Sequence, residues 1–597
     1  MIPALLILGS GEARAQVEWN NTLVTEYQIN AIPLDLEVTP NGKVAVVRSN
    51  LPGSNLYNNQ KVTFWRTDTG ASITPGGTPP ASQGNLPWVA STGKPLFSDA
   101  LAVTNDVAVA ISSAAVGYTA ENTTYVDIYR ITYPGGVPQV DFLTSHTLGG
   151  GTNFNTLAGT AHDVAITPNG SLAVVNHTNW IHVFDLSTGG IYRSIHIGGV
   201  DSQGNKGPCS PINIRNSVAV TNSRAIVTTG RGVLAQRKGW VYIVDLTTAD
   251  PVSFPEFQLT NSGTNEHPHD VAVSPNGQLA VVTANSLVGV YDLVNQMPVG
   301  TPISDGQDRL WNFTPPPGHY APDLWDSVEL SDTQAVVIGN QIVYDPQSQN
   351  NFYYWAARVI DISQSSYSAH AVVSGVGASY YNDPAWDLAL SADGKVATVK
   401  SSAHDVALLD VVNSPTSAFI SGFLSGANYP QSSGINGMND ATVILAPKRV
   451  GTSLQRWAVF AGPNGANTLA RLHFYDLSAS SWPVGGGSVV IQTMSELHPT
   501  TDIIAPADLE LAPGGTEAIA RLTETYDDSG QVGGHDWSAW GGAPPAQAGY
   551  SLGGKGKCVG ADSLRMGTQW AVSTSRDPLL IKGWVHIVHS VHESQYP

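Results

Sequence analysis

The chain of 597 residues is acidic and sparsely charged, since 28 Lys and Arg stand against 47 Asp and Glu and give a formal net charge of −19. This balance excludes duplex nucleic acid as an expected partner, because phosphate binding needs a basic surface. Apolar residues make up 42% of the chain and charged residues only 13%, with 60 Gly and 38 Pro, as in packed, turn-rich β structure. No apolar run approaches the roughly 18 residues of a membrane-spanning helix, so no membrane span is expected.

The N-terminus predicts an export signal. Residues 4–8 form a short apolar core, and Ala13-Arg14-Ala15 fits a cleavage site before Gln16. No basic residue precedes the core, which departs from the usual signal. We expect residues 1–15 to be a targeting segment, residues 16–597 to be the folded part, and the protein to be secreted or exposed on the cell surface.

Residues 162–190 carry a pattern that organises the rest of the chain. An apolar run at 164–167 is followed by Asn169-Gly170, a strong hairpin signal because both residues take a positive φ at low cost. Residues 172–175 and 181–184 predict two further strands. Small and β-branched residues occupy both sides of these strands, which predicts sheets buried on both faces by neighbouring sheets.

The same pattern recurs in two alternating versions. The odd version reads LDLEVTPNGKVAVV from Leu34, HDVAVSPNGQLAVV from His269, WDLALSADGKVATV from Trp386 and ADLELAPGGTEAIA from Ala507. The even version lacks the turn glycine and has a long loop between its second and third strands; it reads SDALAVTNDVAVAIS from Ser98, NSVAVTNSRAIVTT from Asn216, DSVELSDTQAVVIG from Asp326 and ADSLRMGTQWAVST from Ala561. A degenerate even member, GINGMNDATVILAP, starts at Gly434.

Repeats of about 50 residues with four short strands are typical of propeller blades. The expected fold class is all-β: a single large β-propeller of ten four-stranded blades in five alternating pairs, with blade starts near residues 35, 99, 163, 216, 270, 326, 387, 434, 508 and 562. Two smaller rings are the alternative. Residues 593–597 are too few for a last strand, so residues 23–29 are predicted to complete the tenth blade and close the ring, which removes exposed sheet edges.

The pattern DVAVSPNGQLAVV, followed by LVGVYDL at 287–293, resembles the YVTN-type repeats of bacterial and archaeal surface-layer and lactonase-like propellers. The resemblance covers nearly all of the chain from Asp35 onward. It implies a secreted or surface-exposed propeller. Its motifs specify the blade and carry little information about chemistry.

The most regular polar feature is an aspartate that opens the first strand of most units: Asp35, Asp99, Asp163, Asp270, Asp326, Asp387, Asp508 and Asp562. One interpretation is a ring of carboxylates that binds a cation or makes an electronegative pore. The favoured interpretation is structural, with each aspartate accepting backbone N–H bonds and fixing its blade to the next. Asn216 and Gly434 interrupt the ring, which weakens a symmetric site.

The loops that enter the first strands and the loops between second and third strands are expected on one face of a propeller. Basic residues gather in those loops, at Arg231, Arg237, Lys238, Lys448, Arg449, Arg456, Arg576 and Lys582. One interpretation is a docking patch on the loop-rich face. The favoured interpretation is that long loops are solvated and carry charge without binding anything.

Other polar and aromatic residues give weaker signals for a site. His162, His267 and His269 lie at or before first strands, but Trp386, Ala507 and others hold the matching positions, so no metal site is expected. The loop 526–537 lacks calcium-loop spacing despite its acidic pair Asp527-Asp528. A sugar-stacking platform or inter-blade packing would explain Tyr353, Tyr354, Trp355, Trp537 and Trp540. No catalytic motif is visible, and we expect no catalytic residue and no cofactor.

The two cysteines, Cys209 and Cys558, lie in entering loops of units four and ten, too far apart in a ten-bladed ring for an ordinary bridge. In an oxidising exterior they predict an inter-subunit disulfide; two buried thiols or an intrachain bridge are the alternatives. The expected function is a non-enzymatic structural or interaction protein that self-assembles outside the cell. The alternatives are a lactonase-type or metal-dependent propeller enzyme, or a module that binds surface glycans. The sequence does not discriminate among ligands or assembly geometries.

Overall fold

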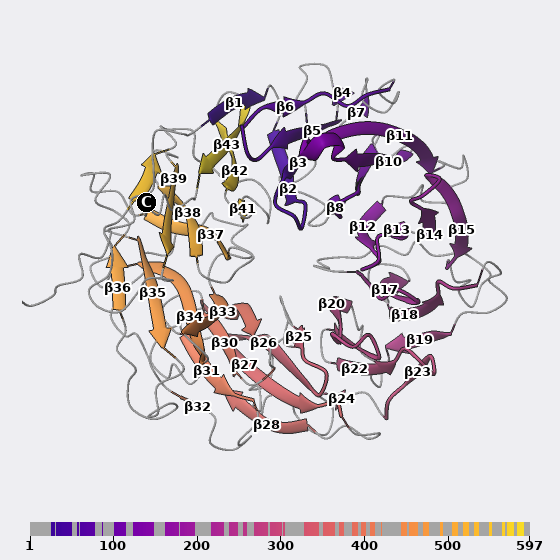
Figure 1. Ribbon diagram of the computed structural model, residues 1–597. Coiled ribbons are helices and arrows are strands. Elements are labelled where there is room, and N and C mark those ends of the chain that lie inside the picture. Colours follow the sequence, from indigo (N-terminus) through magenta and orange to yellow (C-terminus); the bar gives the residue numbers. More distant parts are fainter. Residues whose placement is uncertain are drawn as a thin grey trace, which may run out of the picture.

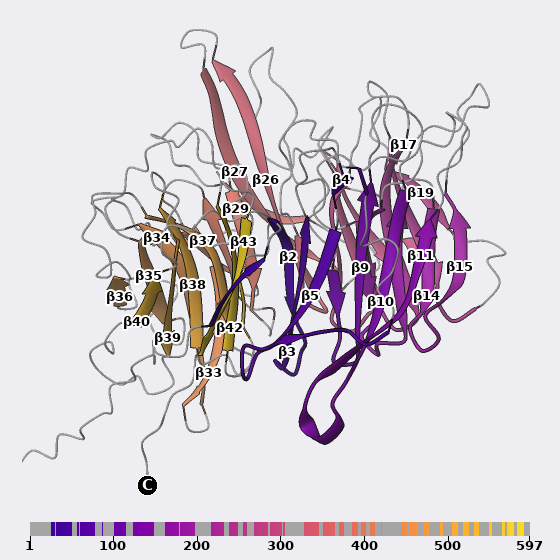
Figure 2. The same ribbon diagram turned by 90° about the horizontal axis from the view of Figure 1, so that it is seen from above.

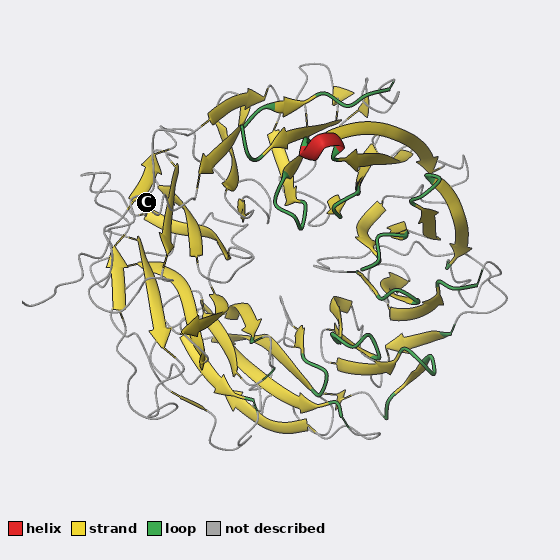
Figure 3. Cartoon of the chain, viewed as in Figure 1, coloured by secondary structure: helices red, strands yellow, loops and turns green. Residues whose placement is uncertain are grey.

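The computed structural model describes the strands of the chain and the tight turns between many of them. The described residues are 25–29, 32–50, 57–58, 60–77, 86–87, 101–114, 123–148, 161–177, 180–197, 217–231, 238–248, 255–259, 268–284, 287–300, 303–304, 328–345, 350–363, 369–374, 385–391, 394, 396–401, 406–411, 419–420, 443–450, 453–463, 470–476, 490–493, 504–511, 517–524, 530–536, 548–551, 564–566, 570–577 and 582–589. Within them nearly all structure is strand, with one short 3-10 helix, η3 (Pro134–Gly136) (Figure 3).

The strands form antiparallel sheets that follow one another along the chain. In the first half they are β2 (Ile32–Val38), β3 (Val44–Asn50), β5 (Gln60–Arg66) and β6 (Ser72–Ile73); β8 (Leu101–Val103), β9 (Val107–Ala114), β10 (Thr123–Thr132) and β11 (Gln139–Leu148); β12 (Ala161–Ile166), β13 (Leu172–His177), β14 (Trp180–Asp185) and β15 (Gly190–His196); β16 (Val218–Val220), β17 (Arg224–Arg231), β18 (Lys238–Asp245) and β19 (Glu256–Leu259); and β20 (Pro268–Val273), β21 (Leu279–Ala284), β22 (Leu287–Asp292) and β23 (Met297–Pro298), with β24 (Ile303–Ser304) also on β22.

The second half repeats the arrangement. Its sheets are β25 (Val328–Leu330), β26 (Gln334–Asp345), β27 (Asn350–Asp361) and β28 (Ala369–Ser374); β29 (Ala385–Leu390), β30 (Val396–Ser401), β31 (Val406–Asp410) and β32 (Phe419–Ile420); β33 (Val443–Val450), β34 (Ser453–Pro463), β35 (Ala470–Asp476) and β36 (Val490–Thr493); β37 (Ile504–Leu511), β38 (Glu517–Glu524), β39 (Gly530–Asp536) and β40 (Ala548–Ser551); and β41 (Leu564–Met566), β42 (Trp570–Asp577), β43 (Lys582–His589) and β1 (Thr25–Ile29). A small separate sheet pairs β4 (Tyr57–Asn58) with β7 (Leu86–Pro87). We number the main sheets one to ten by their first strands.

The main sheets lie around a common centre in chain order, with their first strands innermost (Figure 1). The two faces of a strand therefore pack against two different sheets. In β9, Val109 and Ile111 belong to the apolar cluster shared with the third sheet, whereas the intervening Ala108 and Ala110 belong to the cluster shared with the first sheet. This geometry explains why the strands lack the apolar and polar alternation of a half-exposed sheet.

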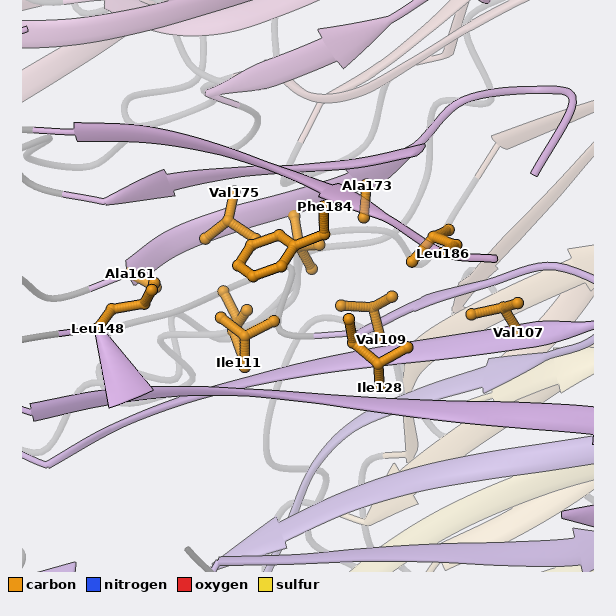
Figure 4. Packing of buried hydrophobic residues seen from close by; sticks show 12 residues of the cluster. Val107, Val109, Ile111, Ile128, Leu148, Ala161, Ala173, Val175, Phe184 and Leu186 are labelled. Carbon is orange, nitrogen blue, oxygen red and sulfur yellow. The ribbon is translucent and has the colours of Figure 1, made fainter. Parts of the chain in front are cut away.

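The layer between sheets two and three shows how this packing works (Figure 4). Phe184 of β14 is fully buried, and it meets Ile111 and Ile128 from the second sheet within one cluster. Val175 and Ala173 extend the same layer along β13. Small residues beside β-branched and aromatic ones let two twisted sheets approach closely at the density typical of protein interiors.

The turn between the first two strands of sheets one, three and five follows from its Thr/Ser-Pro-Asn-Gly sequence. In the third sheet Gly170 has a φ of 69°, and its N–H donates to the carbonyl of Thr167 at 2.7 Å. The Thr167 hydroxyl donates to Asn169 Oδ1 at 2.8 Å and accepts from the N–H of Leu172 at 3.0 Å. Thr39 and Ser274 make the corresponding bonds in sheets one and five. The predicted hairpins at these positions are therefore confirmed.

The two ends of the chain meet in one sheet. The N-terminal strand β1 pairs with β43 over five residues, from Thr25↔Ile587 to Ile29↔Gly583. The last sheet also packs on the first sheet, because Val572, Val585 and Ile587 share an apolar cluster with residues of β2, β3 and β5. Arg565 Nη2 and Glu37 Oε1 add an ion pair at 3.2 Å between these two sheets.

Sheet eight differs from the sequence-based expectation. The degenerate unit was expected to start near Gly434 with a long loop at 447–457, but β33 and β34 occupy 443–450 and 453–463 as the first two strands of the sheet. The predicted start lies outside the described residues. The error arose because this unit lacks both the strand-opening aspartate and the turn glycine, so nothing in its sequence fixed the register.

Candidate functional site

The repeated aspartates of the odd sheets lie where one sheet meets the next. Asp35, Asp163 and Asp270 are all buried, with 2–4% of their surface exposed. Asp35 Oδ2 accepts the N–H of Leu101 at 2.8 Å, and Asp270 Oδ2 accepts that of Val328 at 3.3 Å. Each of these carboxylates thus bonds to the first strand, or to the residue before it, in the following even sheet.

Asp163 makes the fullest set of these contacts. Its Oδ2 accepts the N–H groups of Ser217 at 2.7 Å and Val218 at 2.8 Å, and the Ser217 hydroxyl lies at 3.4 Å. Burial raises the pKa of Asp163 to about 6, and the N–H bonds from Ser217 and Val218 act in the opposite direction. A carboxylate used in this way holds two sheets together and is shielded from solvent.

A β-bulge precedes the aspartate in all five odd sheets. The register shifts between Pro33 and Asp35, and again at the matching step before Asp163, Asp270, Asp387 and Asp508. The extra residue bends the strand and turns the next side chain toward the neighbouring sheet. Sequence analysis did not predict this bulge, because the repeat has the same length in every odd copy.

The residue paired with each aspartate differs from sheet to sheet. The pairs are Asp35↔Arg48, Asp163↔Asn176, Asp270↔Thr283, Asp387↔Lys400 and Asp508↔Arg521. Asn176 Nδ2 donates to Ser217 Oγ at 2.8 Å and to the Thr228 carbonyl at 3.1 Å, so it also spans the sheets. Burial lowers the pKa of Arg48 to about 10, while Asp35 and Asp127 favour its charged form. The strand-opening aspartates therefore have chemically different partners in different sheets.

The opposite ends of the odd sheets carry a second set of bonds to the same neighbours. The backbone N–H groups of Asn41, Asn169 and Asn276 donate to side-chain oxygens of Asn105, Asn222 and Asp332 at 2.7–2.8 Å. The turn glycine faces the other way, since Gly277 lies against Thr221 of the preceding sheet. Sheets one, three and five are thus each bonded to the following even sheet at both ends of their first hairpin. Asp99, Asp326 and Asp562 lie outside the described residues.

A histidine cluster that sequence analysis missed lies between sheets two and three. His177 of β13 and His182 of β14 are buried, with ring centroids 5.4 Å apart. His182 Nδ1 lies 2.8 Å from Ser194 Oγ, and its ring stacks beside Trp180. Burial, reinforced by the nearby His177 and His146, lowers the pKa of His182 to about 3. The sequence does carry a signal for His182, because His473 in LHFYDL and His586 in WVHIVH hold the matching third-strand position in two other units.

The histidines singled out from sequence occupy other positions in the sheets. His162 and His269 are the bulge residues of β12 and β20, and His269 is buried; His267 lies outside the described residues. Within the part of the chain that the structure describes, no group of three or more His, Cys, Asp or Glu side chains could hold a metal ion. No helix within the described ranges is long and apolar enough to cross a bilayer.

The predicted docking patch is divided between two faces, so the expectation of one shared face was wrong. Arg231 and Lys238 end the hairpin between β17 and β18, and Arg576 and Lys582 end that between β42 and β43, which join second and third strands. The remaining described members, Lys448, Arg449 and Arg456, belong to the hairpin between β33 and β34, which joins first and second strands and so turns at the opposite end. Arg237 lies outside the described residues.

Three of the aromatic residues considered for sugar binding lie in the part of the chain that the structure describes. Tyr353, Tyr354 and Trp355 belong to β27, in a hairpin with β26 that projects beyond one face of the molecule (Figure 2). Trp537, Trp540, Asp527 and Asp528 lie outside the described residues, as do both cysteines, Cys209 and Cys558. The projecting hairpin was expected as a loop. Its strands are long because residues 334–361 pair without a shift in register.

Comparisons with known proteins found distant structural neighbours of this chain. No protein-family model and no curated protein sequence matches the chain. Similar solved structures include a eukaryotic initiation factor, with a TM-score of 0.36 and 11% identity over 87% of this chain and 88% of that chain. They also include the WD40 domain of SCAP from fission yeast (TM-score 0.34, 9% identity, 72% and 96% covered) and the C-terminal WD40 domain of Sif2 (0.31, 10%, 73% and 93%). The fold is all-β, built from repeated four-stranded antiparallel sheets, with propeller domains among its structural neighbours.

Proposed function

We propose that the chain forms one closed propeller of ten blades, with β1 as the closing strand. The first strands contact one another in sequence from β2 through β8, β12, β16, β20, β25, β29, β33 and β37 to β41, and β41 contacts β2. The ion pair between Arg565 and Glu37 and the apolar cluster between the first and last sheets support closure. Two separate rings would instead need a contact between non-consecutive first strands near the middle of the chain.

We further propose that this propeller is a non-enzymatic structural protein of the cell exterior that associates with itself, and that it uses no cofactor. The observation that carries the proposal is the use of the repeated carboxylates and amides as bonds between sheets. The residues that recur in the repeat hold neighbouring sheets together, whereas the hairpins that project beyond the sheets differ from one sheet to the next. Scaffolds of this kind present partner-binding surfaces on their connections. We also propose that the chain is related to surface-layer propellers.

The test is to produce the full chain in a secreting host and to follow its location and mass. We expect the protein in the culture medium, with a mass by light scattering above the 62.9 kDa of one chain. Electron microscopy should show discrete rings or ordered assemblies of rings. A protein that stays inside the cell as a monomer at high concentration would contradict both the location and the self-association.

The cysteines give a second, separable test of how copies associate. We propose that Cys209 of one copy bonds to Cys558 of another after export. Non-reducing electrophoresis of secreted material should show species of two or more chains that collapse to one band on reduction. A single monomer band without reductant, in material that light scattering shows to be associated, would remove the disulfide and leave non-covalent association. The basic residues on the two faces are candidates for contacts with acidic surfaces of neighbouring copies.

A further inference from the structure

Two strands of sheet six continue beyond the rest of the sheet. β26 and β27 pair with each other from Gln334↔Asp361 to Asp345↔Asn350. Their neighbours stop early, because β25 pairs only with residues 335–337 and β28 only with residues 356–360. Residues 339–345 and 350–355 therefore form a two-stranded ribbon, which projects from one face of the molecule (Figure 2).

This ribbon lacks the features that protect exposed strands. A two-stranded hairpin by itself is marginally stable in water, and both of its outer edges carry backbone N–H and C=O groups that no other described strand takes up. Natural edges are blunted by lysine, proline or a bulge. The ribbon segments contain no Lys, Arg or Pro, and the pairing between β26 and β27 has no bulge. Such an edge is suited to pairing with another strand.

The composition of the ribbon limits what can pair with it. Its outward run on β27 reads NNFYYW at 350–355, and its run on β26 reads GNQIVYD at 339–345. Asp345 is the only charged residue of the two segments at neutral pH. Aromatic and β-branched residues at this density have high strand propensity. The partner must therefore offer a strand edge with apolar side chains and very little charge.

We propose that the partner is the same ribbon of a second copy, with β27 pairing antiparallel to β27 of that copy about a two-fold axis. This inference rests on the self-association proposed above and names the contact. Two chains of net charge −19 repel each other, so they meet most readily where charge is lowest. Two-fold pairing satisfies the outer β27 edge of each copy with identical groups and makes a closed dimer. It also places aromatic residues opposite one another across the new strand pair.

The test inserts charge at the centre of the ribbon in the full chain. Tyr353→Lys and Tyr353→Glu each place like charges near one another across the axis, and like charges opposite one another destabilise a strand pair. Each variant alone should dissociate at about tenfold higher concentration than the wild type, a change of about 1.4 kcal/mol. An equal mixture of the two variants should recover the wild-type association, since Lys then faces Glu. Sedimentation or light scattering of the secreted chain measures all three.

Two controls separate the ribbon from a general surface effect. Tyr192→Lys adds the same charge at an exposed aromatic residue of β15, 37% exposed, and should leave association unchanged. Replacing residues 342–353 by Asn-Gly shortens the ribbon to the Gln341↔Tyr354 pair with a two-residue turn, and should give a folded monomer. Circular dichroism and melting confirm that each variant folds.

The outcomes distinguish this inference from the proposed function. Association that survives both the charge variants and the shortened ribbon overturns the ribbon contact and leaves self-association standing. Loss of association in each charge variant without recovery in the mixture overturns two-fold pairing. A wild-type chain that is monomeric at high concentration overturns the self-association and the ribbon contact together. Binding of the ribbon to a different protein in place of a second copy also overturns the inference.

Discussion

Asp163 shows how one side chain stabilises a boundary between two sheets. Its Oδ2 accepts two backbone N–H groups, from Ser217 and Val218, and both donors are buried. In Asp163→Ala these N–H groups lose their acceptor, and each buried group left without a partner costs about 1–3 kcal/mol. We expect the variant to lose about 2–5 kcal/mol of unfolding free energy, measured by denaturant titration.

Two comparisons make the Asp163 result specific. Asp163→Asn keeps an oxygen that accepts N–H bonds and should lose clearly less stability than Asp163→Ala. Asp185→Ala removes a carboxylate that bonds to the neighbouring residues Ser187 and Thr188 in an exposed turn and should cost less than about 1 kcal/mol. Equal losses in all three variants would show that the boundary does not depend on this carboxylate.

His182 gives the fold a dependence on pH. Burial first, and then His177 and His146, lower its pKa from 6.5 to about 3 in the folded protein. A base whose folded pKa is depressed takes up its proton more readily when unfolded, so its contribution is complete above about pH 6.5 and is lost as pH falls. At about pH 4.5 we expect a loss of about 2–3 kcal/mol relative to pH 7 from this residue.

The measurement compares unfolding of the wild type and His182→Asn across this pH range. The asparagine keeps a polar group near Ser194 Oγ and does not titrate. The unfolding free energy of the wild type should therefore fall relative to that of the variant as the pH is lowered from 7 to 4.5. Parallel pH profiles for both proteins would mean that folding does not lower the pKa of His182.

Sequence reasoning at the residue scale succeeded for repeated positions. It located the strand-opening aspartates and favoured a role between sheets, which Asp35, Asp163 and Asp270 have, because a residue that recurs in every odd unit occupies the same place in each sheet. It could not find the bulge before each aspartate, since a bulge common to all copies changes no spacing between copies. It also missed His177 and His182, whose burial depends on how sheets two and three pack.

Phe184 tests the layer of apolar residues between two sheets. Its ring is fully buried among residues of sheets two and three, and the His146 ring lies 5.2 Å from it. Phe184→Ala removes the largest side chain of this layer and leaves a cavity, at a cost of about 3–5 kcal/mol. Tyr192→Ala in the adjacent strand β15 is exposed and serves as the control. Similar melting temperatures for both variants would contradict a rigid layer.

The strands could be predicted from the sequence wherever the turn between them has a recognisable sequence. The Pro-Asn-Gly turn fixes the register of sheets one, three and five, because glycine at φ near 69° and the bonds of the preceding Thr or Ser specify one hairpin. Sheet eight has no such turn, and a hairpin of β33 and β34 stands where a long loop was expected. The long pairing of β26 with β27 was also missed, since Asp345-Pro346 and the polar residues after it read as a loop.

For the whole molecule, the pairing of β1 with β43 is the feature most open to a direct test. Deleting residues 17–30 removes β1 and leaves five residues of β43 without their strand partner. We expect a lower melting temperature and association through the uncovered edge, because an exposed strand edge pairs readily with other chains. Removing residues 593–597 shortens the chain at its other end and should change neither. Unchanged melting and a monodisperse truncated protein would exclude closure by β1.

The bonds between sheets alternate along the chain, so an odd sheet and an even sheet cannot replace one another. The described odd sheets direct carboxylates and turn amides to the following even sheet and present a glycine to the preceding one. Excising one sheet would bring two sheets of the same kind together, with their donors and acceptors mismatched. Excising residues 161–267, an odd sheet and the even sheet after it, would restore the alternation. We expect this chain to melt higher than one lacking residues 161–216 alone, although it has lost more core. We therefore expect folded variants of this chain to gain or lose sheets in pairs.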